Sequence, residues 1–317
     1  MADDKIIAVV GATGAQGGGL ARAILDDEAG GFAVRALTRD PSSDKARELA
    51  DRGAEVVAAD VDDGSTLEEA FQGVYGAFCV TFFWAHFSPE REVAEARAMA
   101  AAARSTGVEH VIWSTLEDTR RWVPLEDDRM PTLMGDYKVP HFDGKGEADH
   151  HFRDAGVPTT FLLTSFFWDN LIHFGMGPQR DDDGGLSMSF PMGDSKLPGI
   201  ASEDIGRCAY GIFKRGGELV GETVGIAGEH LTGRQMAAAL TLALGQEVRY
   251  KDVSPAVYRG LGFPGAEDLG TMFQFKRDFE EYFCGARDLA RSRALNPRLQ
   301  TFSDWLRRNA DEIPIPE

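Results

Sequence analysis

Cysteine and long hydrophobic runs are both scarce in this 317-residue chain, and each scarcity excludes a class of protein. Cys79, Cys208 and Cys284 are scattered through apolar stretches without metal-ligand spacing, so we expect buried thiols, no disulfide framework and no bound metal. No run of about twenty apolar residues occurs, and the start does not resemble a cleavable signal. These absences predict a soluble, cytoplasmic protein without membrane attachment.

Basic residues are also few. The chain has 33 Lys and Arg against 51 Asp and Glu, which gives a formal net charge of −18. Nucleic-acid binding needs a basic surface that neutralises phosphates, so nucleic acid is not expected as a direct ligand. The classes that remain are an enzyme and a ligand-binding module.

The clearest signal is a glycine-rich turn near the N-terminus. The apolar run at residues 6–10 is typical of a strand buried on both faces of a parallel sheet. Gly11, Gly14 and Gly17 follow with the spacing G-x-x-G-x-x-G, ahead of a helical pattern. The first glycine permits a tight turn, the second lets the backbone approach a pyrophosphate, and the third brings the helix close to the strand. The pattern predicts a dinucleotide site, whose loop also contains Thr13, Ala15 and Gln16.

Arg39 stands where the type of dinucleotide is selected. It follows the second predicted strand, residues 32–37, where an enzyme for the unphosphorylated cofactor usually carries an acid that binds the ribose 2′-hydroxyl. A guanidinium can instead bind a 2′-phosphate, with Lys45 and Arg47 nearby. The alternative is an arginine in a solvated turn, with Asp40 capping the next helix. The phosphate interpretation is favoured and predicts NADP(H).

Asp60 and Val61 follow the third predicted strand, residues 54–58. An acid at this point can accept a hydrogen bond from the adenine amino group, while the next backbone N–H reaches a ring nitrogen. The carboxylate of Asp60 can equally cap the helix that starts near Ser65. Both interpretations stay open.

The fourth predicted strand, residues 76–81, ends in a run of aromatic residues. In doubly wound sheets, ligands lie just outside the carboxyl ends of the strands. Thr81 and Phe82, with Phe83 and Trp84 after them, are therefore expected beside the ribose and nicotinamide. Hydrophobic packing of the loop is the alternative.

Strands and helices alternate up to residue 164, and the alternation then loosens. This order predicts an α/β fold with a doubly wound parallel sheet, the NAD(P)-binding Rossmann fold, over residues 1–164. The irregular residues 116–140 are expected to be a lid or binding loop with few anchoring residues. Residues 165–317 are expected to form a smaller, mostly helical α/β lobe, of which parts of 186–227 can return to the first domain.

Four motifs resemble those of one family: VVGATGAQGG, HFDGKGE (141–147), FFWDNL (166–171) and LGFPGAEDL (261–269). The chain resembles the NmrA-like family, the atypical branch of the short-chain dehydrogenases/reductases, and within it the HSCARG-type NADPH sensors. The resemblance implies a six- or seven-stranded parallel sheet, a smaller C-terminal lobe, NADP(H) as cofactor and regulation by redox state. The third motif adds Phe167 and Asn170 to the expected cofactor contacts.

The Tyr-x-x-x-Lys pair of the wider superfamily is incomplete here. Lys145 occupies the lysine position and can hold the cofactor ribose, but the residue one helical turn earlier is His141 instead of tyrosine. Imidazole can transfer protons near neutral pH, although a histidine that caps or lines the site is favoured. Ser114, after the fifth predicted strand (109–113), is a candidate to orient a bound group or merely ends the strand.

Two functions are compatible with these features. The first is a redox sensor that changes conformation or protein partner with the ratio of NADPH to NADP⁺. The second is an NADPH-dependent reductase of a quinone, enone, imine or similar small apolar acceptor. The missing tyrosine and the resemblance favour the first, whereas the aromatic residues after the fourth strand suit the second. The oligomeric state, monomer or homodimer, is open.

Overall fold

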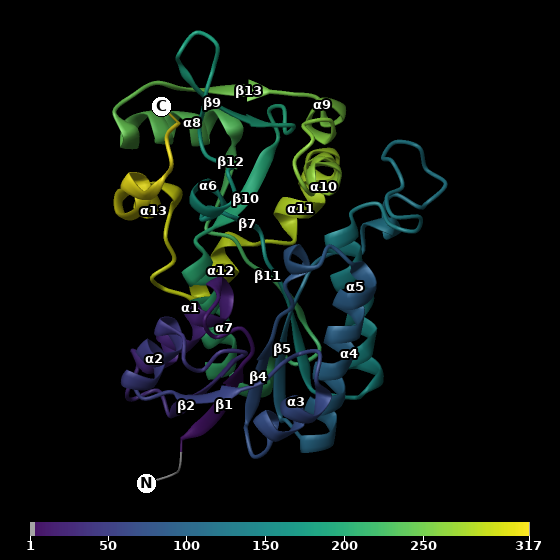
Figure 1. The fold of residues 1–317 in the computed structure, drawn as a ribbon, viewed down its shortest axis with the longest axis vertical. Helices are drawn as coiled ribbons and strands as arrows, with labels where there is room; N and C mark the ends of the chain where they lie inside the picture. The colour runs from purple at the N-terminus through teal and green to yellow at the C-terminus, as the bar shows by residue number, and fades with distance from the viewer. Residues whose placement is uncertain (1–3, 317) are drawn as a thin grey trace. The chain divides into compact units, whose positions relative to one another are not determined.

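A computed structural model describes residues 4–316, and Figure 1 shows the course of the chain. The chain divides into two compact units. The first comprises residues 4–118, 141–164 and 203–224, and the second comprises residues 119–140, 165–202 and 225–316. Residues 119–140 group with the second unit although they lie inside the expected 1–164 domain, and residues 203–224 return to the first unit.

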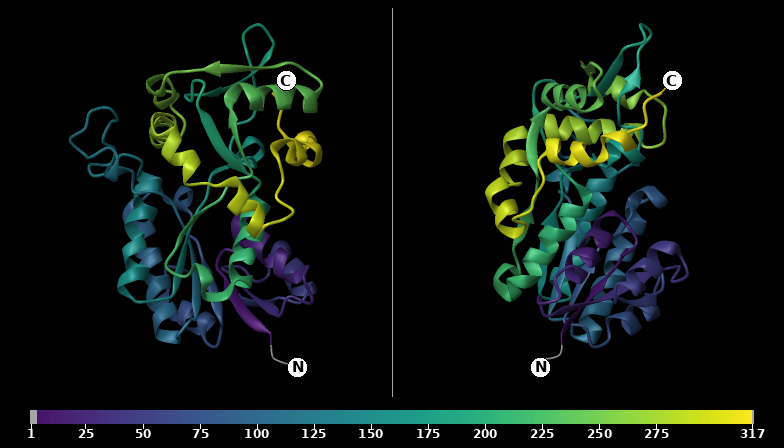
Figure 2. Two further views of the ribbon diagram at one scale, coloured as in Figure 1. Left: turned by 180° about the vertical axis from the view of Figure 1, so that it is seen from behind. Right: turned by 90° about the vertical axis from the view of Figure 1, so that its left-hand side faces the viewer.

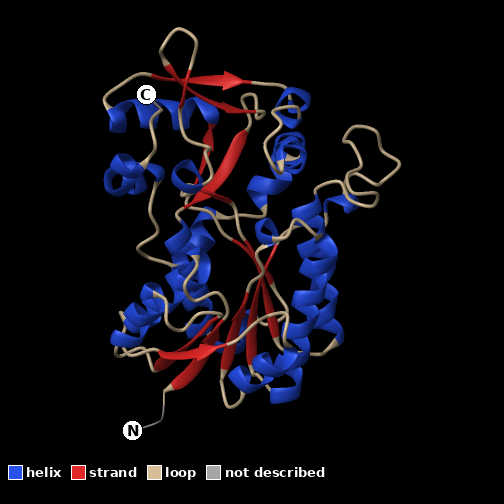
Figure 3. Cartoon of the chain, viewed as in Figure 1, coloured by secondary structure: helices blue, strands red, loops and turns tan. Residues whose placement is uncertain are grey.

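The first unit is built on a seven-stranded sheet with the order β11-β6-β5-β4-β1-β2-β3 (Figure 3). Each pairing from β3 to β6 is parallel. The strands are β1 (Lys5–Val9), β2 (Phe32–Thr38), β3 (Glu55–Ala58), β4 (Gly76–Cys79), β5 (His110–Thr115), β6 (Thr159–Leu163) and β11 (Thr223–Gly225). The order 3-2-1-4-5-6 is that of doubly wound dinucleotide-binding folds. The predicted doubly wound sheet is confirmed.

Helices lie on both faces of this sheet (Figure 2). They are α1 (Ala15–Leu25), α2 (Asp44–Asp51), α3 (Gly64–Phe71), α4 (Pro89–Thr106), α5 (Pro140–Asp154) and α7 (Ser202–Lys214). The bounds of α4 follow from local chemistry. Ser88 Oγ accepts from the N–H of Arg91 at 3.2 Å and Pro89 opens the helix, whereas Gly107 ends it with φ 73°.

A glycine contact holds α7, which is distant in sequence, against α1. A Cβ built on Gly206 would lie 2.0 Å from the backbone nitrogen of Leu20, and one on Gly19 would lie 2.8 Å from the carbonyl oxygen of Glu203. The two helices therefore approach backbone to backbone, which only glycine permits. This contact explains why residues 203–224 belong to the first unit.

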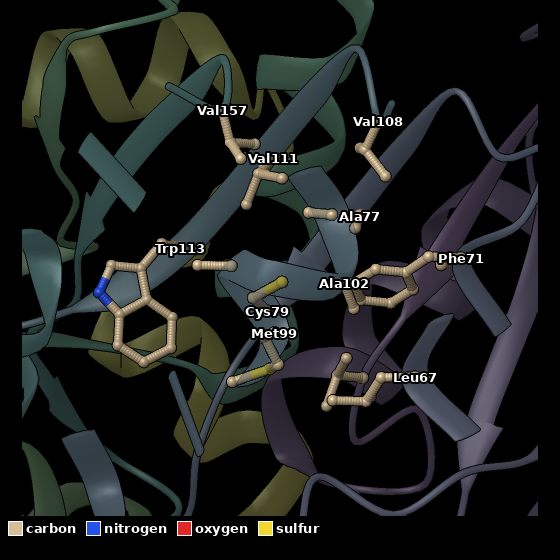
Figure 4. Close-up of a cluster of buried hydrophobic side chains, with 14 of the residues drawn as sticks. Leu67, Phe71, Ala77, Cys79, Met99, Ala102, Val108, Val111, Trp113 and Val157 are labelled. Atoms are coloured by element: carbon tan, nitrogen blue, oxygen red, sulfur yellow. The ribbon is translucent and has the colours of Figure 1, made fainter. Parts of the chain in front are cut away.

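One apolar cluster fills the space between the sheet and helices α3, α4 and α5 (Figure 4). It combines strand residues such as Ala77 with Phe71 of α3 and Met99 of α4, all almost completely buried. Trp113 of β5 stacks on Phe152 of α5, with ring centroids 5.1 Å apart. Burial of one large apolar side chain contributes roughly 1.5–3 kcal/mol. The cluster thereby holds β4 and β5 against these helices.

The second unit contains two three-stranded sheets with the orders β12-β10-β7 and β13-β9-β8. The strands are β7 (Phe166–Phe167), β8 (Gln179–Arg180), β9 (Leu186–Phe190), β10 (Lys196–Ile200), β12 (Glu229–Thr232) and β13 (Val248–Asp252). The helices are α6 (Asn170–His173), α8 (Gly233–Leu244), α9 (Pro255–Arg259), α10 (Ala266–Asp278), α11 (Glu280–Gly285), α12 (Leu289–Leu295) and α13 (Phe302–Asn309). None of the described helices of either unit combines the length and apolar character needed to cross a membrane.

A buried lysine organises residues 119–140 from within. Lys138 is 1% exposed, and its Nζ donates to the carbonyl oxygens of Leu125, Asp127 and Met130 at 3.1, 2.8 and 2.8 Å. The expectation that few residues anchor this segment is therefore wrong. A lysine in a charged stretch is typical of a solvated side chain, so the sequence pattern does not reveal this role.

Candidate functional site: a dinucleotide cradle

Three glycines shape the turn between β1 and α1, each in a different way. Gly11 has φ +65°, a left-handed conformation that other side chains rarely adopt. A Cβ on Gly17 would lie 2.5 Å from the carbonyl oxygen of Gly11, so the helix packs directly on the turn. Gly14 has an ordinary φ of −92°, and a Cβ there would lie 3.2 Å from the same oxygen. Space rather than backbone angle restricts the residue at position 14.

The first turn of α1 presents backbone donors. Gly14 is the N-cap and has no side chain to cap the helix, so the N–H groups of Ala15 and Gln16 have no intrahelical acceptor. Ala15 is exposed, and Thr13 and Gln16 are half-buried. Among the described residues of this turn none is acidic, which leaves the positive end of the helix dipole available to an anion.

Ser114 and Gln16 lie together at this turn. Ser114 is the fifth residue of β5 rather than a residue after the strand, because β5 extends to Thr115. Its Oγ donates to Oε1 of Gln16 at 2.7 Å, and the serine is 2% exposed. The hydroxyl of Ser114 thus orients the side chain of Gln16.

Arg39 is exposed directly after β2, and among residues 4–316 no protein group pairs with its guanidinium. Asp40 does not compete for it, because its Oδ1 accepts from the N–H and hydroxyl of Ser42 at 2.9 and 2.5 Å. These hydrogen bonds lower the pKa of Asp40. The N-cap of α2 is Ser43, so the alternative that Asp40 caps this helix is wrong. Arg39 remains available to an anion.

Asp60 does not cap α3 either. The N-cap is Asp63, whose side chain accepts from the N–H of Ser65 at 3.0 Å, so the capping alternative for Asp60 is wrong. Oδ1 of Asp60 accepts from the N–H of Asp62 at 3.1 Å. Within the described part of the chain the other carboxylate oxygen has no partner, and both Asp60 and Val61 are half-buried. A free acceptor beside a backbone N–H is the arrangement that adenine needs.

Thr81, just after β4, is the centre of a buried polar contact set. Lys145 Nζ lies 2.5 Å from Oγ1 and 3.2 Å from the carbonyl oxygen of Thr81. It also lies 3.2 Å from Oε2 of Glu92, to which the Thr81 hydroxyl donates. An ammonium group has three donors, so these three acceptors use its full capacity. Sequence reasoning missed Glu92. Its spacing to the buried Ala96 and Met99 on α4 was the signal that could have indicated burial.

Two glycines place Lys145 within reach of these acceptors. A Cβ on Gly144 would lie 3.2 Å from Cα of Pro89, where α4 begins. A Cβ on Gly146 would lie 2.3 Å from the backbone nitrogen of Asp118. Because α5 approaches its neighbours this closely on either side of Lys145, the amine can reach Thr81 and the helix α4. This packing gives a physical reason for the G-K-G sequence in the HFDGKGE motif.

His141 lies one turn before Lys145, and it is buried among aromatic rings. It is 7% exposed, and its ring centroid lies 4.9 Å from that of Trp84 and 5.9 Å from that of Phe83. The two aromatics belong to the short 3-10 turn η1 (Phe83–Ala85). Phe82 differs from them because it is 57% exposed. Loop packing thus accounts for Phe83 and Trp84, and Phe82 is the ring presented to solvent after β4.

Phe167 and Asn170 belong to the second unit. Phe167 ends β7 and pairs with Ile200 of β10, and Asn170 is the first residue of α6. Both side chains are half-buried. The fold of the second unit therefore accounts for their backbone positions, and their contact with a cofactor stays a prediction.

Two of the three cysteines are buried. Cys79 and Cys208 are buried, which raises the pKa of each thiol, whereas Cys284 is only half-buried and its pKa is raised to about 11. The expectation of burial is therefore wrong for Cys284. Among residues 4–316, no group of three or more His, Cys, Asp or Glu side chains could hold a metal ion.

Comparison with known proteins identifies the family of the chain. The family model described as "NmrA-like family" matches residues 3–306. The NmrA-like family domain-containing oxidoreductase FrzB of Cladobotryum sp. is 30% identical over 288 residues, which cover 85% of this chain and 83% of that protein. The NAD(P)H azoreductase of Xenophilus azovorans is 26% identical over 312 residues, which cover 96% and 98%.

A solved structure of similar fold is that of NmrA, a negative transcriptional regulator, in complex with NADP. It matches with a TM-score of 0.77 at 24% identity, over 96% of this chain and 95% of that one. At this identity the likeness concerns the fold, and it includes the seven-stranded sheet described above. Because the family model spans nearly the whole sequence, the predicted resemblance to the NmrA-like family is confirmed, and the chain belongs to that family.

Proposed function

We propose that this protein is an NADPH-dependent reductase that transfers a hydride to a small, flat, conjugated acceptor. One observation carries the proposal. The side chains that could donate a proton at the ends of β4 and β5 are engaged with the protein: Lys145 with Thr81 and Glu92, and Ser114 with Gln16. Acceptors that delocalise charge after hydride addition need the least help from a general acid.

The residues of the first unit fit the cofactor. The N–H groups of Ala15 and Gln16 would hold the pyrophosphate, and the exposed guanidinium of Arg39 would hold a 2′-phosphate. The free oxygen of Asp60 would accept from adenine. The bound dihydronicotinamide supplies the hydride. The crystallised complex of NmrA with NADP, a member of the same fold, supports this assignment.

The acceptor class follows from the exposed ring of Phe82 and from the named relatives. A ring that is 57% exposed offers an apolar face on which a flat molecule can stack. Quinones, enones and imines are flat and conjugated, and the name of the azoreductase relative adds azo compounds to this class. We propose acceptors of this chemistry rather than simple ketones or alcohols.

The redox sensor remains a second candidate, because a site whose Lys145 and Ser114 are engaged with the protein can bind NADPH and leave it unoxidised. A sensor needs a segment whose conformation differs between the two cofactor forms. Residues 116–140 were the expected segment, and the three carbonyl contacts of Lys138 weigh against a loosely held loop over most of it. A regulatory protein partner would also be needed for the sensor.

Oxidation of NADPH with a panel of acceptors separates the two candidates. We expect measurable turnover with at least one quinone, enone or azo compound and little with cyclohexanone. The matched control is Gly14→Val, in which a side chain fills the space of the pyrophosphate, so that turnover should be lost. Saturable binding of NADPH without oxidation by any acceptor would favour the sensor instead.

A further inference from the structure

Helix α4 carries two buried acids one turn apart, Glu92 and Glu95, which are 0% and 5% exposed. Charged side chains at such positions are unusual unless they are paired. Their partners differ. Glu92 contacts Lys145 and Thr81, whereas Oε1 of Glu95 accepts from Nε of Arg91 at 3.1 Å. Only Glu92 lies next to the amine of the expected cofactor site.

We propose that Glu92 is the positioning residue of Lys145, holding its amine charged and aimed at Thr81 at the carboxyl end of β4. The inference depends on the cofactor-binding part of the proposed function and not on reductase activity. A buried amine without a counter-ion tends to lose its proton, because burial disfavours the charged form. Lys145 is 8% exposed, so the carboxylate of Glu92 at 3.2 Å offsets that tendency.

No other carboxylate takes the place of Glu92 in the contacts of the Lys145 amine within residues 4–316. On β5, the ring of Trp113 lies 5.3 Å from Nζ. On α5 itself, Asp149 is bound to Trp113 and Thr115, at 3.0 and 2.7 Å from its Oδ1. These contacts direct the carboxylate of Asp149 at the strand, so Glu92 is the counter-ion.

The remaining charged groups near this part of α4 contact the other oxygen of Glu92, Glu95 or Asp62 instead of the Lys145 amine. His86 Nε2 lies 4.0 Å from Oε1 of Glu92 and 3.6 Å from Oε1 of Glu95, and Arg91 also binds Asp62. His86 Nδ1 accepts from the N–H of Ser88 at 3.0 Å, so the ring is neutral with its proton on Nε2. Burial lowers the pKa of His86, which agrees with a neutral ring. Lys145 is thus the cation that faces Glu92 from the cofactor side.

The three N–H donors of the Lys145 amine limit how it can bind a cofactor. All three donors of Lys145 are used by Thr81 and Glu92, so a ribose hydroxyl can be bound only in exchange for one of these acceptors. Glu92 keeps the amine charged through that exchange. Removal of its charge should therefore make the affinity for NADPH fall with rising pH more steeply than in the parent.

The direct test is the titration of Lys145 in the cofactor-free protein, followed by NMR of ¹³C-labelled lysine side chains. In Glu92→Gln the amine of Lys145 should lose its proton at a lower pH than in the parent, because its carboxylate partner at 3.2 Å is gone, whereas the matched control Glu95→Gln should follow the parent. An unchanged pKa of Lys145 in Glu92→Gln, or an equal shift in both variants, would overturn the proposal. This readout needs no NADPH, so it stands even if the proposed function fails.

The second test is the affinity for NADPH between pH 6 and 9. Glu92→Gln should bind with nearly parental affinity at low pH and about tenfold more weakly above the lowered pKa of Lys145, whereas Glu95→Gln should follow the parent. A uniform loss of affinity at every pH in Glu92→Gln would indicate a merely structural role and would contradict the proposal.

A third variant keeps the proposal testable if Glu92→Gln does not fold. The double variant Lys145→Met/Glu92→Gln removes both charges, whereas Lys145→Met alone leaves the buried carboxylate without its partner. The double variant should therefore unfold at a higher temperature than Lys145→Met. A lower unfolding temperature for that double variant would contradict the pairing.

Discussion

Oγ of Ser114 donates to Oε1 of Gln16 at 2.7 Å, and this bond links the carboxyl end of β5 to the first turn of α1. Ser114, which the sequence suggested as a group that orients a bound molecule, therefore holds the side chain of Gln16 in the glycine-rich turn. Both groups are within the first unit, and the bond is shielded because Ser114 is 2% exposed. A side chain so placed affects binding of the cofactor before it affects chemistry.

Ser114→Ala should weaken binding of NADPH by about two- to tenfold, since it removes one hydrogen bond worth about 0.5–1.5 kcal/mol and frees the side chain of Gln16. Calorimetric titration measures this directly. Ser105→Ala is a suitable control, because Ser105 Oγ bonds to Glu68 in an exposed position on α4. If Ser114→Ala bound NADPH normally and lost turnover by several orders of magnitude, Ser114 would be catalytic instead.

Arg39→Ala should remove most of the preference for NADPH over NADH. The guanidinium is exposed and unpaired among the described residues, so its charge-assisted bonds to a 2′-phosphate should be worth roughly 1.5–3 kcal/mol. Affinity for NADH should change little. Arg52→Ala is the matched control, because Arg52 pairs with Asp26 at 2.6 Å and was not expected at the phosphate. Equal affinity of the parent for the two cofactors would refute the assignment.

Gly14→Val should mainly affect binding of NADPH, whereas Gly17→Ala should mainly affect the stability of the fold. Gly14 is exposed with an ordinary φ, and a Cβ there would lie 3.2 Å from the oxygen of Gly11, so valine should abolish binding of NADPH and lower the unfolding temperature less than Gly17→Ala does. A Cβ on Gly17 would lie 2.5 Å from a backbone oxygen, so even alanine should destabilise the fold by about 1–3 kcal/mol. Thermal unfolding and fluorescence titration of both variants measure the contrast. Normal binding by Gly14→Val would show that this turn does not hold the phosphates.

The free energy of unfolding should depend on pH through the titration of Glu95. Burial, followed by the charges of Glu92 and Asp62, raises the pKa of Glu95 to about 7 from 4.5. A carboxyl with a raised pKa in the folded state binds more protons there than in the unfolded chain. Its contribution to stability is therefore full below about pH 4.5 and is lost as the pH rises through 7.

Urea denaturation at pH 5, 6, 7 and 8 tests this expectation for Glu95. The free energy of unfolding of the parent should fall relative to Glu95→Gln over this range, by at most about 1.4 kcal/mol per pH unit. Glu69→Gln, on the exposed side of α3, should follow the parent. A parent and a Glu95→Gln variant with parallel pH profiles would contradict the raised pKa.

Much of the fold and the cofactor turn could be predicted because their signals are local. Gly11, Gly14 and Gly17 act within one turn, and Arg39 directly follows strand β2. The N-caps were less well predicted, since several acids follow β3 and only backbone geometry selects Asp63 over Asp60. Position along the chain alone does not decide which carboxylate meets a free N–H.

Glu92 and Lys138 show why the rest could not be predicted. Each is a charged residue of a type that is usually solvated, yet each is at most 1% exposed. The burial of Glu92 depends on Lys145, which is far away in the sequence. The burial of Lys138 depends on the fold of the irregular segment whose carbonyl oxygens it binds. A helical pattern places Glu92 on the inner face of α4, but only the close approach of α5 through Gly144 and Gly146 provides its counter-ion.

The proposed reductase activity is tested most directly by following deuterium from C4 of labelled NADPH into an enone. An enone is suitable because the deuteride ends on carbon, where it does not exchange with water. If the protein is a reductase, mass spectrometry should find the deuterium on a carbon atom of the reduced product. The molar amount of labelled product should exceed that of the protein, and no labelled product should form with Gly14→Val. NADPH that binds stoichiometrically and is recovered unoxidised, with no labelled product from any enone and no turnover with quinones or azo compounds, would contradict this activity.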